Sequence, residues 1–187
     1  MTIALAAASL VFTGACVACL VYLHLAPTGY SPVRNAVSEY GIGRYGDWYR
    51  AQAACAGTAA LLLAGALAKG VSPAPRRVIA LLVVLAVTRI AIGRFTTDAL
   101  GTRQASREGT IHVLLAAAAF ASASWAGFAL RPAQHGQPAL GWAMAAFALG
   151  TALSLRNRPL RPWLGLIERG YYVAMLAWLA LVAVRLL

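Results

Sequence analysis

Six long apolar runs, separated by short polar stretches, divide this chain from end to end. About 20 apolar residues in a helix cross the roughly 30 Å hydrocarbon core of a bilayer. Proline, glycine or clustered arginine ends each run, as expected where a helix stops. The pattern predicts an all-α membrane protein, one domain over residues 1–187, with six spans at about 3–25, 48–69, 77–95, 110–130, 139–155 and 164–185. The fifth predicted span is the shortest.

Composition excludes an ordinary soluble domain. Of the 187 residues, 61% are hydrophobic and only 11% are charged, and the mean hydropathy is +0.71. Soluble domains contain about 45 to 50% apolar residues. The net charge of +11 would suggest a nucleic-acid partner in a soluble protein, but these basic residues lie mostly in connections between apolar runs. We therefore expect a multi-pass protein of the cell membrane, with membrane lipid and not nucleic acid as its partner.

The five acidic residues all fall on one side of the predicted membrane, namely Glu39, Asp47, Asp98, Glu108 and Glu168. Asp47 and Glu108 lie at helix starts, where carboxylates favour the helix macrodipole. The acid-bearing side also has more basic residues, which favours the cytoplasm for it. The compact basic group at positions 69, 76 and 77 is an equally good cytoplasmic anchor on the other side, so both orientations stay open.

Asp98 and Arg89 stand out among these charges. Asp98 follows the carboxyl end of the third predicted helix, where the dipole disfavours an anion, so it needs a partner such as Arg94 or Arg103. Arg89 lies roughly 7 Å deeper than Arg94, inside the membrane. A charge at that depth must face the bundle interior.

Two roles are open for Arg89: a structural ion pair with Glu39 or Glu168, or a functional charge in a binding site. In either case we expect contact with Glu39, Asp98 or Glu168.

Two histidines, His24 and His112, are predicted to lie near the same membrane surface. Together with Asp98 and Glu39 they make a weak candidate site for a divalent metal, the one cofactor considered. Alternatively, His24 complements the carboxyl end of its helix, and His112 hydrogen-bonds to Glu108 one turn earlier.

Two stretches carry a resemblance to a known family. After the first apolar run comes PTGYSPVRNAVSEYG (residues 27–41), and the third connection holds FTTD (95–98) and EGTIH (108–112). These stretches resemble the first-loop and third-connection motifs of domain of unknown function family 998. The resemblance spans nearly the whole chain and implies a six-helix membrane fold with a shared polar surface. It implies no reaction, because the family has no agreed activity.

These patterns lead to a hypothesis about function. A polar site at one leaflet, covered by the first connection, is predicted to bind or process an anionic lipid or lipid-linked headgroup. Arg34, Arg89 and Arg94 would hold the phosphate. Glu168 is predicted to lie at a membrane depth comparable to that of Arg89, within the same binding site. Ser38, Glu39, Asp98 and His112 would orient the headgroup or act as acid and base, and Glu39, Asp98 and His112 should converge on one cavity.

Two other functions remain open: a non-enzymatic scaffold or sensor with structural ion pairs, and a transporter of small polar solutes. Small residues at four-residue spacings, such as Gly14 with Ala18 and Gly141 with Ala145, suit helix packing within the chain or a homo-oligomer face.

Overall fold

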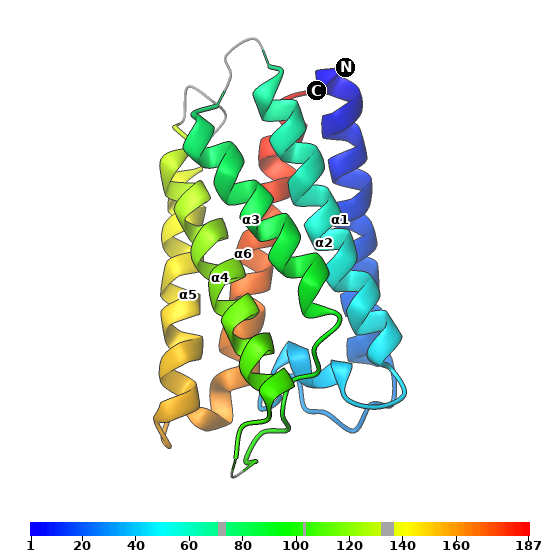
Figure 1. Cartoon of the computed structure of the whole chain (residues 1–187), viewed down its shortest axis with the longest axis vertical. Coiled ribbons are helices and arrows are strands. Elements are labelled where there is room, and N and C mark those ends of the chain that lie inside the picture. Colours follow the sequence, from blue (N-terminus) through cyan, green and yellow to red (C-terminus); the bar gives the residue numbers. More distant parts are fainter. Residues whose placement is uncertain (71–73, 103, 132–136) are drawn as a thin grey trace.

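Six α-helices form the computed structural model, which describes residues 1–70, 74–102, 104–131 and 137–187. The described residues contain no strand. Figure 1 shows the helices side by side, with both termini at one end of the bundle. The helices are α1 (Thr2–Leu25), α2 (Gly46–Ala68), α3 (Arg76–Ile92), α4 (Arg107–Ala129), α5 (Pro138–Arg156) and α6 (Leu164–Val184), with short 3₁₀ helices η1 (Val37–Gly41) and η3 (Arg161–Trp163). The predicted six-helix fold is confirmed.

Five of these helices are long and apolar enough to cross a membrane, and α3 is the exception. Among the five candidate spans α5 is the shortest, with 19 residues, whereas α3 has 17. The third helix ends at Ile92 rather than near residue 95, which leaves Arg94 beyond it. The fourth begins earlier than predicted because Ser106 caps it, accepting a hydrogen bond from the Gly109 N–H at 2.9 Å.

Each helix packs against its neighbours in sequence, and α1 also packs against α6, so the bundle closes. Small residues allow close approaches between helices. A Cβ on Gly57 of α2 would lie 2.7 Å from the Ala86 carbonyl oxygen of α3, and one on Gly127 of α4 would lie 2.8 Å from Gly141 Cα of α5. Gly57, Gly127 and Gly141 therefore pack within the chain.

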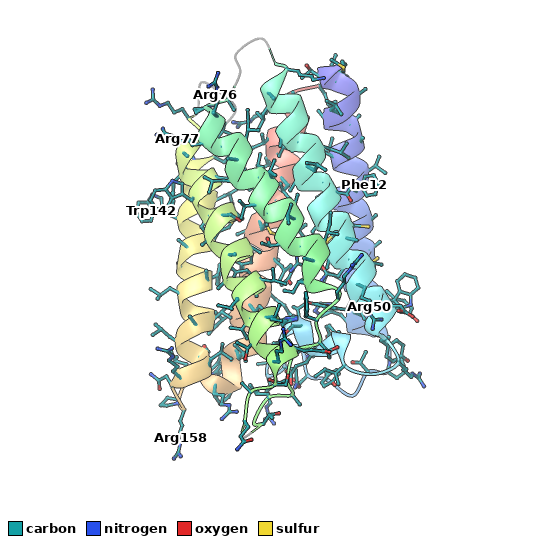
Figure 2. The ribbon with its side chains drawn as sticks, viewed as in Figure 1. Phe12, Arg50, Arg76, Arg77, Trp142 and Arg158 are labelled. Atoms are coloured by element: carbon teal, nitrogen blue, oxygen red, sulfur yellow. The ribbon has the colours of Figure 1, made fainter. Side chains whose placement is uncertain are left out.

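The flanks of the bundle are apolar and exposed, as expected of surfaces that face lipid. Figure 2 shows Phe12 and Trp142 projecting outward from opposite sides, and Trp142 is 70% exposed. Arg76 and Arg77 lie at the end that holds the termini, and Arg158 lies at the other end. The chain is a multi-pass membrane protein with charged residues at both ends of its bundle.

Two loops cover the end of the bundle opposite the termini (Figure 1): loop one, residues 26–45, which contains η1, and loop three, residues 93–106 with position 103 outside the description. Loop one is tied to α6 by a 3.0 Å hydrogen bond from the Leu166 N–H to the Val33 carbonyl. Its Tyr40 is buried, with 1% of its surface exposed. Loop one is thus a packed part of the bundle end.

Candidate functional site

A cavity of about 340 Å³ lies under loops one and three, between α4, α5 and α6; we call it the α4–α6 cavity. Its lining includes six of the residues predicted from sequence to form the site: Ser38, Glu39, Arg89, Asp98, His112 and Glu168. Glu39, Asp98 and His112 therefore meet at one cavity, although they come from loop one, loop three and α4. What each of them does there stays a prediction.

Arg34 and Arg94, the other two predicted phosphate ligands, do not line this cavity. Both side chains are exposed, Arg34 on loop one and Arg94 just beyond the end of α3. The sequence placed Arg94 within the third helix, whereas the early end of α3 turns it outward. Of the three predicted phosphate ligands, Arg89 is therefore the one that lines the cavity.

Arg89 is 2% exposed and faces the bundle interior, as predicted. Its Nη1 donates a hydrogen bond to Tyr172 Oη at 3.0 Å, and its Nη2 donates to Gln52 Oε1 at 3.1 Å. The guanidinium Cζ also lies 5.2 Å from the centre of the Tyr172 ring. Both partners are neutral, so the buried positive charge is not compensated by either of them.

The expectation that Arg89 contacts a carboxylate was wrong. Across the described ranges of the chain, the ion pair present is Arg50–Asp47 at 2.5 Å, which lies on the exposed start of α2. Arg89 Nε is buried and has no hydrogen-bond partner in that part of the chain, and the same is true of Tyr49 Oη and Gln52 Nε2. Three buried donors, one on Arg89 itself and two on the neighbouring Tyr49 and Gln52, thus lack an acceptor.

Sequence reasoning missed Gln52, Tyr49 and Tyr172. Each belongs to a membrane-spanning helix, α2 or α6, and is almost fully buried. An amide in the middle of an apolar run was the available signal for Gln52, because such a group needs a polar partner in lipid. The tyrosines gave no comparable signal, since aromatic residues are common at membrane interfaces for other reasons.

Glu39 joins loop one to loop three. Its Oε2 accepts hydrogen bonds from Asn35 Nδ2 at 3.0 Å and from the Ala36 N–H at 2.9 Å, and its Oε1 accepts from the Leu100 N–H at 3.1 Å. Burial raises the pKa of Tyr30 in the same loop, and the negative charge of Glu39 raises that pKa further. Because both oxygens of Glu39 are occupied, its geometry fits a positioning role better than acid–base chemistry.

Asp98 lies against the start of α4. Its Oδ2 accepts a hydrogen bond from the Ser106 N–H at 2.9 Å, and its carboxylate occupies the space that a side chain on Gly109 would need. This contact compensates the charge of Asp98, since a helix amino terminus favours an anion. Of the two predicted arginine partners, Arg94 forms no ion pair with Asp98 among the described residues, and Arg103 lies outside them. The sequence predicted that Asp98 needs compensation, and the start of α4 supplies it.

His112, one turn into α4, is buried and stacks on Tyr49 with ring centres 6.2 Å apart. Its Nδ1 lies 2.8 Å from the Phe95 carbonyl oxygen and so donates a proton there. In the neutral ring this leaves Nε2 as an acceptor at the cavity. The alternative partner, Glu108, is exposed at the helix start.

Glu168 and Arg169, adjacent on α6, hold loop one in place. Glu168 Oε2 accepts a 2.7 Å hydrogen bond from the Val37 N–H. Arg169 donates to the Asn35 carbonyl at 2.8 Å and to Tyr40 Oη at 3.0 Å. Arg169 was not predicted from the sequence, because nothing there shows that it points toward loop one.

The histidine pair does not form a metal site. His24 Nε2 accepts a hydrogen bond from Arg169 Nε at 2.5 Å. His24 lines a second cavity of about 680 Å³ between α1 and α6, whereas His112 lines the α4–α6 cavity. Among the residues whose placement is described, no group of three or more His, Cys, Asp or Glu side chains could hold a metal ion. The metal set predicted from His24, His112, Asp98 and Glu39 was therefore wrong.

The α4–α6 cavity differs in character between its two parts. Charged and polar groups gather under the loops, whereas α4 and α5 supply an apolar wall of Val113, Ala116, Ala117, Ala121, Ala148, Ala152 and Leu155. Pockets for small ligands commonly have volumes of about 300 to 1,000 Å³. This cavity falls within that range and pairs one polar end with an apolar wall, as a molecule with a headgroup and a chain requires.

Comparison with known proteins places nearly the whole chain within one family description. Residues 4–185 match the family described as Protein of unknown function (DUF998). No curated protein and no solved structure matches the chain.

Proposed function

Because the chain belongs to the membrane family DUF998, whose activity is not established, we propose its function from the α4–α6 cavity: it binds a phosphate-bearing amphiphile, a lipid or lipid-linked headgroup of the cell membrane. The headgroup would occupy the polar end under loops one and three. The chain of the ligand would lie against the apolar wall of α4 and α5.

The buried guanidinium of Arg89 is the observation that carries this proposal. A charged side chain inside a membrane is costly unless it is paired, by about 2.5 to 3.5 kcal/mol for an arginine at a helix centre. The hydrogen-bond partners of Arg89 are Tyr172 and Gln52, both neutral. A phosphate oxygen offers the missing negative charge and accepts well from guanidinium groups.

The neighbouring donors support a ligand rich in acceptors. Tyr49 lines the same cavity, and its hydroxyl, like Arg89 Nε, is buried without a partner in the described structure. Unsatisfied buried donors cost about 1 to 3 kcal/mol each. A phosphate has enough acceptor oxygens to reduce that cost at more than one of these groups.

The alternative is a scaffold in which the polar groups only hold the bundle together. Glu39 favours it, because its three hydrogen bonds join loops one and three and leave neither oxygen without a donor. A scaffold makes a clear contrasting prediction. Changes within the cavity should alter stability but should not alter the binding of lipid.

The first test replaces the cavity arginine, using Arg89→Gln with Arg94→Gln as the matched control. Both variants remove one charge at the end of α3, but Arg94 is exposed and lies outside the cavity. Binding of a short-chain phospholipid to the detergent-purified protein would be measured by titration. Hydrogen bonds to charged groups contribute about 1.5 to 3 kcal/mol, so we expect at least about tenfold weaker binding for Arg89→Gln alone.

A second pair of variants tests the apolar wall without touching a charge. Ala117→Phe fills the cavity from α4, whereas Ala54→Phe adds the same bulk to an exposed position of α2 outside it. We expect Ala117→Phe alone to block binding. Unchanged binding in both Arg89→Gln and Ala117→Phe would overturn the proposal and favour the scaffold.

A further inference from the structure

The charges that line the α4–α6 cavity are unbalanced. Among the residues whose placement is described, three carboxylates, on Glu39, Asp98 and Glu168, line it together with one arginine, Arg89. A ligand that brought only a phosphate would add a further negative charge beside these carboxylates, and like charges repel. The lining therefore favours a ligand that also carries a positive charge.

Two of the three carboxylates have one oxygen that accepts no hydrogen bond. Glu168 is 6% exposed and uses Oε2 for the Val37 N–H, and Asp98 uses Oδ2 for the Ser106 N–H. Within the described part of the chain, Glu168 Oε1 and Asp98 Oδ1 accept no hydrogen bond, whereas both oxygens of Glu39 do. Glu168 and Asp98 are thus the carboxylates that offer a donor in the ligand an oxygen with no hydrogen bond of its own.

We propose that the ligand is zwitterionic: its phosphate binds Arg89 and the Tyr49 hydroxyl, and a primary ammonium group beyond the phosphate binds Glu168 and Asp98. This inference rests on the proposed function, since it specifies the headgroup of the same ligand. An ammonium has three donors and no acceptor, which matches carboxylate oxygens. The buried and unpartnered Tyr49 hydroxyl is independent of the acids and calls for an acceptor in the same cavity.

The test compares headgroups on identical short acyl chains. The full-length protein in detergent is titrated with a phosphoethanolamine lipid, which carries an ammonium, and with a phosphoglycerol lipid, which carries a neutral diol. We expect the wild type to bind the phosphoethanolamine lipid at least about tenfold more tightly, since a charge-assisted hydrogen bond contributes about 1.5 to 3 kcal/mol. Equal binding, or a preference for phosphoglycerol, would overturn the zwitterionic ligand.

Two variants test whether Glu168 and Asp98 cause the preference for the phosphoethanolamine lipid. Glu168→Gln keeps an acceptor for the Val37 N–H but loses the charge, and Asp98→Asn does the same toward the Ser106 N–H. Each should reduce the ratio of the two affinities to below about threefold, mainly by weakening the phosphoethanolamine lipid. Glu108→Gln is the matched control, because Glu108 is an exposed acid of α4 outside the cavity. It should leave the ratio unchanged.

Failure of this inference and failure of the proposed function give different results. If Arg89→Gln weakens both lipids but Glu168→Gln and Asp98→Asn leave the ratio unchanged, the cavity binds phosphate and the ammonium site is wrong. If neither lipid binds the wild type, or Arg89→Gln and Ala117→Phe change neither affinity, the proposed function itself fails. Because the two acids lie on different elements, a folding defect in one variant leaves the other to decide.

Discussion

Gly165→Ala should loosen loop one, because the backbone of this loop lies directly against Gly165 of α6. A Cβ at this position would lie 2.7 Å from the Pro32 carbonyl oxygen and would press still harder on the Asn35 carbonyl oxygen. Both obstacles are backbone atoms, which cannot rotate away as a side chain can. Loop one must therefore shift away from α6 to admit the methyl group.

The free energy by which Gly165→Ala destabilises the packed loop follows from two opposing effects. Overpacking costs about 1 to 3 kcal/mol, and contact with two backbone carbonyls points to the upper end. Replacing glycine by alanine in a helix recovers at most about 1 kcal/mol. The net loss is about 2 kcal/mol, which corresponds to a roughly 30-fold larger population of the displaced loop.

Limited trypsin digestion reports this population, because Arg34 and Arg44 are exposed cleavage sites within loop one. When opening and closing are fast relative to cleavage, the cleavage rate follows the open population. We expect cleavage of Gly165→Ala at these sites to be about 30 times faster than in the wild type.

Gly14→Ala on α1 is the control, since a Cβ there has no neighbour within 4 Å. Its loop-one cleavage should match the wild type. If Gly165→Ala is also cut at the wild-type rate, the close packing of loop one on α6 is not what holds the loop.

Three further changes test the contacts described above. Glu39→Gln places an amide NH₂ group where the carboxylate accepts hydrogen bonds, and it should lower the free energy of unfolding by about 1 to 3 kcal/mol. The loss would be measured as a lower midpoint of thermal unfolding in detergent. An unchanged midpoint would contradict the three hydrogen bonds that Glu39 accepts. Gln52→Leu removes an acceptor from the buried Arg89 and should destabilise by about 1.5 to 3 kcal/mol, whereas the double variant with Arg89→Met should recover most of that loss. If the double variant is no more stable than the single one, the Gln52–Arg89 bond is not the cause. Gly127→Val should separate α4 from α5 at Gly141 and cost about 1 to 3 kcal/mol, and a variant as stable as the wild type would refute the close approach.

The residues of the candidate site could be identified from the sequence more readily than their partners. Charges are rare in this chain, so each acid or buried arginine stands out, and its depth can be counted from the helix end. This is why Glu39, Asp98, His112, Arg89 and Glu168 were selected, and all five line one cavity.

The partners depend on side-chain direction and on exact helix ends, which are set by packing between segments far apart in sequence. Arg89 bonds to Gln52, 37 positions away, and Tyr172, 83 positions away, rather than to a carboxylate. No local pattern specifies such a pair. The early end of α3 likewise decides that Arg94 is exposed and Arg89 buried.

The sequence by itself determined the membrane environment, the six helices and the side on which the acids lie. These features follow from the length and composition of each apolar run, because lipid requires every spanning backbone to satisfy its own hydrogen bonds. Only the tertiary structure decided that Arg169 and Glu168 hold loop one, that His24 and His112 line different cavities, and that Arg89 lacks a carboxylate partner. Those outcomes depend on which faces of the helices meet, and helices surrounded by lipid choose these faces by close packing of small residues rather than by a hydrophobic pattern that can be read along the chain.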